Sequence, residues 1–132
     1  MIKNGPVSYS VPTGNFGDIL AGWVAKKMGL PIDNLLIATN ENDILARALE
    51  NGIYSIDKAK ATMSPSMDIQ ISSNFERLLF EAYGRDTSKI KNLMNNLKEN
   101  KEFQIDSRAL KFIKEDFLAK SITEKATKDC IA

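Results

Sequence analysis

The chain has 132 residues, with 18 basic and 17 acidic side chains, one cysteine and no histidine. This length suits one domain with a modest core, and the net charge of +1 removes the simplest argument for a nucleic-acid partner. Without histidine or a second cysteine, a Ser-His-Asp triad, a histidine-ligated metal site and an internal disulfide are excluded, so we predict no metal. No apolar run approaches the roughly 20 residues of a membrane span, and residues 1–6 lack a signal-peptide pattern. We therefore expect a cytoplasmic protein with no membrane partner.

A parallel βαβ unit is predicted for the first forty residues. Residues 7–11 alternate apolar and small polar side chains, which predicts a short strand. Residues 19–28 have helical spacing, and Gly29 and Pro31 end that helix. Residues 35–38 are continuously apolar, as in a strand buried on both faces. The two strands should be parallel, with a right-handed crossover.

The rest of the chain is predicted to be mostly helical. Asn42 or Asp43 caps a helix over residues 44–49 that ends at Asn51-Gly52, and a long loop follows over 53–71. Ser73 and Glu76 match a capping box for a helix over 75–83 that Gly84 closes. Further elements are helices at 88–99, 107–119 and 123–130, and a brief extended segment at 103–105.

Charge is concentrated in the last 52 residues of the chain. Residues 1–80 carry 7 basic and 8 acidic side chains, whereas residues 81–132 carry 11 and 9. The first part is therefore expected to be better buried, and the second to form helices with wide solvated faces. The basic residues assigned to such a face are Lys89, Lys91, Lys98 and Lys101.

The turn between the first strand and the first helix contains Gly14 and Gly17. Glycines leave a backbone free to adopt unusual φ and ψ angles and to approach a ligand closely. The start of a helix adds free N–H groups and the positive end of a dipole. Together these features predict an anion site, best suited to a phosphate monoester, beyond the carboxyl ends of the strands. The alternative is an ordinary turn with Asp18 as the N-cap. A nucleotide is less favoured, because the Walker lysine and a third glycine are missing.

The run Val11-Pro12-Thr13-Gly14-Asn15-Phe16-Gly17-Asp18 closely resembles the phosphate-binding loop of threonine synthases, a family of fold-type II pyridoxal-phosphate enzymes. Further similar blocks follow in the family's order, at residues 21–22, 25–26, 29–31, 37–43, 62–69 and 73–79. The resemblance implies an α/β fold: a single partial domain of the three-layer fold-type II architecture, with a short parallel βαβ unit followed by mostly helices. Residues 1–84 would carry the βαβ unit and the matched blocks, and residues 85–132 would form peripheral charged helices.

The resemblance also implies a cofactor and a reaction. Pyridoxal phosphate would act as an electron sink, and the family converts O-phospho-L-homoserine and water to L-threonine and phosphate. The cofactor phosphate would be held by Gly14, Asn15, Phe16, Gly17 and Asp18, with Thr13 as an adjacent hydroxyl donor. The family's Schiff-base lysine would precede Met1, so no catalytic residue is predicted within this chain. We expect a fragment that is inactive alone, and that pairs with the missing N-terminal part of the enzyme or with itself.

The sequence also leaves alternative functions and residue roles open. The chain could be a non-catalytic α/β module that binds a phosphate-containing ligand or a partner. An amino-acid dehydratase fits less well, because the blocks at 64–69 and 73–79 are not expected in that group. Asn74 and Arg77, at the start of a helix, are candidates for the substrate phosphate, or else a cap and a surface pair. Ser64, Ser66 and Asp68 either line the site or only shape the long loop. Asn40 and Asn42 either reach the same face of the sheet or serve as turn and cap residues. Cys130 is expected to be an uninvolved thiol.

Overall fold

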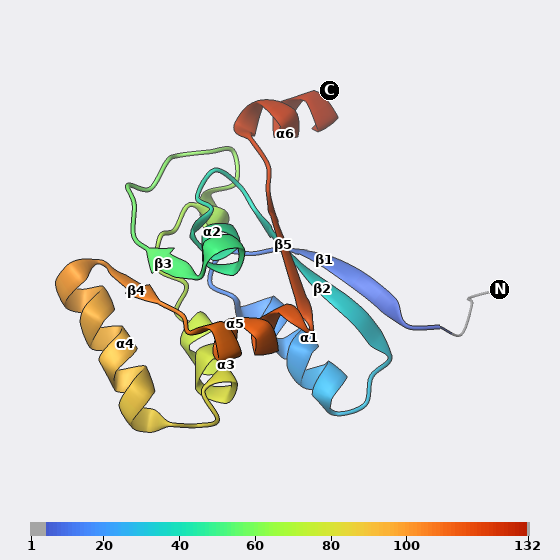
Figure 1. Cartoon of the computed structure of the whole chain (residues 1–132). Helices are drawn as coiled ribbons and strands as arrows, with labels where there is room; N and C mark the ends of the chain where they lie inside the picture. The colour runs from blue at the N-terminus through green and yellow to red at the C-terminus, as the bar shows by residue number, and fades with distance from the viewer. Residues whose placement is uncertain (1–4, 132) are drawn as a thin grey trace.

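The structure, a computed structural model, describes residues 5–131 (Figure 1). No helix within this range is long and apolar enough to cross a membrane, and the range holds no group of three potential acidic or cysteine metal ligands. The elements in chain order are β1 (Val7–Pro12), α1 (Gly17–Lys27), β2 (Ile32–Thr39), α2 (Ile44–Asn51), β3 (Ile53–Ser55), the 3-10 turn η1 (Pro65–Met67), α3 (Phe75–Ala82), α4 (Thr87–Asn100), β4 (Glu102–Gln104), α5 (Ser107–Lys114), β5 (Phe117–Ser121) and α6 (Glu124–Ile131).

A three-stranded parallel sheet organises the fold, in the order β1-β2-β5. Val11 is paired with Ile37, and Ile37 with Ala119, so the carboxyl ends of all three strands meet at one edge. The predicted parallel βαβ unit is confirmed. A separate antiparallel pair, β3-β4, lies beside α2 and α4 (Figure 1).

The core lies on one face of the parallel sheet. Leu35, Ile37 and Phe117 point to that face and are buried in the same cluster as the apolar residues of the helices. Side chains alternate between the two faces of a strand, so Leu36 and Leu118 point to the other face. Leu36 is half-buried and Leu118 is 53% exposed. Residues 5–131 therefore cover one face of the sheet and leave the other partly open.

An ionic contact fixes α1 against the start of β5. The Asp116 carboxylate accepts a hydrogen bond from Trp23 Nε1 at 2.9 Å and pairs with Lys26 Nζ at 2.7 Å and with Lys27. Burial alone would raise the pKa of Asp116, but the hydrogen bonds from Lys26, Lys27 and Trp23 outweigh it and lower that pKa below its ordinary value. Trp23 in turn stacks on Phe117 at 6.5 Å between ring centroids.

Two predicted elements are wrong. The helix expected over residues 107–119 ends at Lys114, and the chain re-enters the sheet as β5, because pairing with β2 overrides a short apolar pattern that suits either state. The loop expected over residues 53–71 begins with β3, which pairs with β4 but is too short to show a period of two. The helices predicted at 44–49, 75–83, 88–99 and 123–130 are confirmed within about two residues at each end.

The ends of the helices agree only in part with the cap residues predicted from the sequence. Gly52 and Gly84 end their helices with positive φ angles of 79° and 64°. The predicted capping box at Ser73 is wrong, because Asn74 is the N-cap of α3 and makes no side-chain cap bond. The Ser73 hydroxyl instead donates to Asn15 Oδ1 at 3.4 Å.

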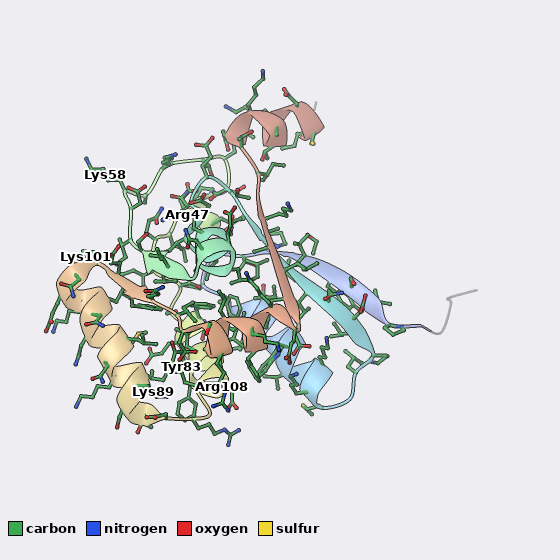
Figure 2. All side chains as sticks on the ribbon, in the orientation of Figure 1. Arg47, Lys58, Tyr83, Lys89, Lys101 and Arg108 are labelled. Carbon is green, nitrogen blue, oxygen red and sulfur yellow. The ribbon has the colours of Figure 1, made fainter. Side chains whose placement is uncertain are left out.

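Basic side chains project from several separate elements and loops of the chain (Figure 2). The four lysines assigned to a solvated face are all exposed, which confirms that prediction. Lys89 in the first turn of α4 lies over the ring of Tyr83 at 5.9 Å from its centroid, and Arg108 of α5 lines the same small pocket (Figure 2).

Candidate functional site

The loop between β1 and α1 encloses a hollow at the carboxyl edge of the sheet. The hollow has a volume of about 170 Å³ and is lined by residues 12–19. All six residues predicted to hold a cofactor phosphate are among them. Thr13 and Phe16 are buried, whereas Asn15, Gly17 and Asp18 are exposed.

Six consecutive backbone N–H groups of this loop, from Gly14 to Ile19, donate no hydrogen bond to any atom within residues 5–131. The residues on either side do have backbone hydrogen bonds. Thr13 N donates to Ala38 O of the neighbouring strand at 2.8 Å, and Leu20 N donates to Phe16 O at 3.1 Å as the first bond of the helix. Free N–H groups at the start of a helix carry partial positive charge, and the helix dipole adds to it. Such a run of donors can bind an anion without any basic side chain.

The predicted unusual backbone angles at the two glycines are wrong. The positive φ belongs to Phe16, at φ 67° and ψ 8°, and neither Gly14 nor Gly17 has a positive φ. Such a conformation is costly for a residue with a side chain. The Phe16 ring is held in the core, with its centroid 5.4 Å from that of Phe75 and 5.6 Å from that of Phe117. Packing of one aromatic side chain therefore fixes the bend of the loop.

Gly14 is required by a close approach within the protein. A Cβ atom built on Gly14 would lie 2.6 Å from the backbone oxygen of Ser66, far inside contact distance. The same atom on Gly17 would lie 3.6 Å from Asn74 Nδ2, an ordinary contact. The loop containing η1 thus packs directly on the loop that encloses the hollow.

Thr13 and Asp18 flank the hollow on its strand side and its helix side. The Thr13 hydroxyl donates to Val11 O at 2.6 Å, so its hydrogen is directed at the strand end. Asp18 lies in the first turn of α1 and is not the N-cap, because Phe16 holds that position. The negative charge of Asp18 at the helix start favours the helix itself.

The segment before α3 holds the other side of the loop. Ser72 Oγ donates to Gly14 O at 2.8 Å. The backbone N and the side-chain Nδ2 of Asn74 both donate to Asn15 O, at 3.1 and 3.0 Å. Neither Ser72 nor Asn74 lines the hollow. Sequence reasoning missed Ser72, and its small size and polarity gave no distinctive signal.

Arg77 lies one turn further along α3 and faces a different space. It is exposed and lines a groove of about 790 Å³ between α3 and α4, with Phe80 and Met94 on the apolar side. Within residues 5–131, its guanidinium forms no ion pair. The structure therefore brings Asn74 to the glycine loop and Arg77 to the groove beside it, with Ser73 touching both.

A partly buried polar network joins the loop containing η1 to the end of β2. Asp68 Oδ1 accepts from Asn40 Nδ2 at 2.7 Å, from Asn42 Nδ2 at 3.1 Å and from Thr62 Oγ1 at 2.7 Å, and Asp68 Oδ2 accepts from Thr62 N at 2.7 Å. The bond from the Thr62 amide is the main cause that lowers the pKa of Asp68. Asn40 and Asn42 are thus paired with the protein itself, in a turn role.

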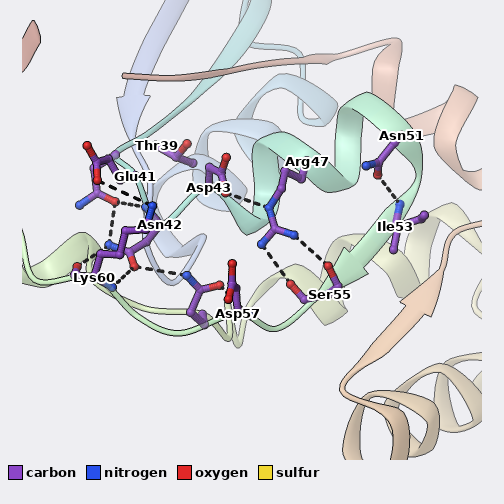
Figure 3. Close-up of polar contacts among 12 residues, drawn as sticks. Thr39, Glu41, Asn42, Asp43, Arg47, Asn51, Ile53, Ser55, Asp57 and Lys60 are labelled. Carbon is purple, nitrogen blue, oxygen red and sulfur yellow. Dashed lines mark hydrogen bonds and ion pairs between the residues drawn. The ribbon is translucent and has the colours of Figure 1, made fainter. Parts of the chain in front are cut away.

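Asn42 extends this network toward the start of the same loop (Figure 3). Its side chain donates to Lys60 O and accepts from Lys60 N, both at 2.8 Å, as a strand partner would. Arg47 on α2, which sequence reasoning did not single out, binds Asp43 Oδ1 at 2.8 Å and Ser55 Oγ at 2.8 Å and so links α2 to β3. Cys130 is exposed on α6, away from these contacts.

Taken together, a parallel sheet and a loop with six free N–H donors beyond the carboxyl ends of its strands define an α/β protein whose strand-to-helix turn has the donor set that suits an anion. No protein-family model matches the chain. It is 49% identical over 135 aligned residues to threonine synthase of Saccharomyces cerevisiae, covering 95% of this chain and 26% of that protein. It is 41% identical to threonine synthase of Pseudomonas aeruginosa, covering 96% of this chain and 27% of that protein. The crystal structure of PLP-bound threonine synthase from Brucella melitensis superposes with a TM-score of 0.91 at 56% identity, over 95% of this chain and 27% of that one.

The chain is therefore a homologue of one segment of threonine synthase. It spans about a quarter of the length of the relatives it matches. The α/β fold expected from the resemblance is confirmed for the parallel sheet.

Proposed function

We propose that this chain provides the part of a threonine synthase that binds the phosphate group of pyridoxal phosphate. The complete site would convert O-phospho-L-homoserine and water to L-threonine and phosphate, in the cytoplasm. The observation that carries the proposal is the run of six free N–H groups from Gly14 to Ile19 around a hollow of about 170 Å³. Homology to PLP-bound threonine synthase supports the choice of ligand.

The donor set fits a phosphate monoester in kind. Phosphate oxygens accept hydrogen bonds from backbone N–H groups, and the start of α1 favours their negative charge. Gly14, Asn15, Phe16, Gly17 and Asp18 would bind the phosphate through their amides, and the Thr13 side chain would hold the end of β1 in place. When bound, pyridoxal phosphate supplies an electron sink for chemistry at the substrate carbons. This chain's own residues bind and orient the phosphate end.

Pyridoxal phosphate itself is a poor probe of binding, because its aldehyde also reacts with surface lysines. Pyridoxine 5′-phosphate carries the same phosphate arm but forms no Schiff base. In equilibrium dialysis we expect the 132-residue chain to bind pyridoxine 5′-phosphate, with inorganic phosphate as a competitor, and to bind pyridoxine at least ten-fold more weakly. Equal binding of the two compounds, or of neither, would contradict the proposal.

A second candidate function is a non-catalytic phosphate-binding module. It predicts the same dialysis result, so activity must separate the two. We expect co-expression of this chain with the remaining segments of a homologous threonine synthase to restore growth of a threonine auxotroph, because the covalent lysine would come from those segments. The module is the better description if growth is not restored although both polypeptides are present.

Arg77 remains our proposed contact for the substrate phosphate. Its guanidinium has no carboxylate partner within residues 5–131, and it lines a groove that Ser73 joins to the glycine loop. In the reassembled enzyme, Arg77→Ala should raise KM for O-phosphohomoserine while leaving the binding of pyridoxine 5′-phosphate unchanged. Asn74, by contrast, is bonded to the loop and is not proposed to touch the substrate.

A further inference from the structure

Two neighbouring carbonyl groups of the glycine loop are held by the segment before α3. Gly14 O accepts a hydrogen bond from the Ser72 hydroxyl at 2.8 Å, and within residues 5–131 it has no other donor. Asn15 O accepts two bonds from Asn74, one from the backbone N at 3.1 Å and one from Nδ2 at 3.0 Å.

These carbonyl bonds determine where the adjacent N–H groups point. In a trans peptide the C=O of one residue and the N–H of the next point in opposite directions, and residues 5–131 contain no cis peptide. Because the Gly14 and Asn15 carbonyls face residues 72–74, the N–H groups of Asn15 and Phe16 face away from that segment. Residues 72–74 do not line the hollow, so these two donors turn toward its side of the loop.

Ser72 is itself held rigidly. It is 4% exposed, and its backbone N donates to the Tyr54 hydroxyl at 2.8 Å. The Tyr54 ring is stacked between Phe75 and Phe103, at centroid distances of 5.5 and 4.9 Å. The strand pair β3-β4 thereby supports the loop through one side chain.

We propose that Ser72 and Asn74 are positioning residues of the phosphate site. Each fixes one carbonyl of the loop and so orients one amide toward the phosphate: Ser72 that of Asn15, and Asn74 that of Phe16. The inference rests on the proposed function, since it assigns how that site is kept in its binding geometry.

Residue-resolved titrations test this assignment. In ¹H–¹⁵N correlation spectra of the full 132-residue chain, pyridoxine 5′-phosphate should shift the amide signals of both Asn15 and Phe16. In Ser72→Ala we expect the Asn15 shift to be lost selectively and the affinity to fall about ten-fold, the typical effect of one charge-assisted hydrogen bond. In Asn74→Ala the Phe16 shift should shrink selectively, with a fall of only about three-fold, because the backbone bond from residue 74 remains.

Ser88→Ala is the matched control, because the side chain of this exposed serine in the first turn of α4 makes no hydrogen bond within residues 5–131 and lines neither the hollow nor the groove. It should bind as the unaltered chain does. A purely structural role would reduce both amide shifts together in each variant, and that result would overturn the inference, as would unchanged affinity in both variants. If the unaltered chain shows neither shift nor binding, the proposed function fails instead. Should Ser72→Ala not fold, the selective loss at Phe16 in Asn74→Ala decides the question alone.

Discussion

The backbone of the glycine loop depends on two residues whose roles differ from what their types suggest. Phe16 carries the left-handed conformation, at φ 67°, and its buried ring supplies the packing that offsets the strain. Gly14 has an ordinary φ but no room for a side chain beside Ser66 O. A glycine pair in a sequence therefore indicates a tight loop without telling which residue bears the unusual angle.

Substitution by alanine should separate the two glycines. Gly14→Ala places a Cβ 2.6 Å from Ser66 O, so the loop containing η1 must move. We expect the free energy of unfolding to fall by about 1–3 kcal/mol, as for other overpacked sites. Urea titration followed by the fluorescence of Trp23, the single tryptophan, measures this.

Gly17→Ala is the matched control for that experiment. Its Cβ would meet Asn74 Nδ2 at 3.6 Å without strain, and alanine is a better helix former than glycine. The free energy of unfolding should stay within about 0.5 kcal/mol of the unaltered chain or rise. A Gly14→Ala variant as stable as Gly17→Ala would show that the contact with Ser66 does not constrain the loop.

At the scale of elements, the sequence predicts a helix or strand correctly where the element has its own periodicity and its own terminating residues. The run over β1, α1 and β2 contains an alternating strand, a helix ended by glycine and proline, and a continuously apolar strand, and all three form as predicted. β5 could not be predicted in this way, because Phe117-Leu118-Ala119 suits helix or strand and only the partner strand β2 decides. Likewise, the sequence predicts the glycine loop as the candidate site, but the contacts of Ser72 and Asn74 with that loop join residues 58 and 59 positions apart and leave no local signal.

The Asp68 carboxylate accepts hydrogen bonds from Thr62 in the loop containing η1 and from Asn40 and Asn42 after β2, so the order of that loop should depend on pH. Hydrogen bonds, chiefly from the Thr62 amide, lower the pKa of Asp68 from its ordinary value of 3.8. A lowered pKa in the folded state means that the ionised form stabilises the structure above the ordinary pKa, and that this contribution is lost as the pH falls through the lowered value. We expect the loop to stay closed near pH 6 and to loosen below about pH 4.

Hydrogen exchange at the Thr62 amide measures this loosening. Asp68→Asn should lower its protection roughly ten-fold at pH 6 and remove most of the pH dependence, because a charge-assisted acceptor is lost. Asp57→Asn is the control in the same loop, since that exposed carboxylate accepts from Lys58 N and not from Thr62. Equal protection of Thr62 in Asp68→Asn and Asp57→Asn would refute the role of Asp68.

At the scale of the whole molecule, each outer strand of the parallel sheet lacks a strand partner on its outer side within residues 5–131. β1 and β5 are its edges, and Tyr9 and Leu118 expose 48% and 53% of their surface there. Parallel sheets usually have both faces covered, and open apolar edges pair with other strands. The chain spans about a quarter of its relatives, and we propose the remainder of such a protein as the partner of these edges.

The isolated 132-residue chain should therefore self-associate through the sheet. In size-exclusion chromatography with light scattering we expect a mass above the 14.7 kDa of the monomer, rising with concentration. Combined Tyr9→Lys and Leu118→Lys substitutions should return it to a monomer, because charged side chains on edge strands block pairing. Met28→Lys is the control: Met28 is 83% exposed at the end of α1 and belongs to no strand, and its replacement should leave the association unchanged. A monomer at every concentration would mean that the open edges are tolerated in water, and an equal effect of Met28→Lys would place the contact elsewhere.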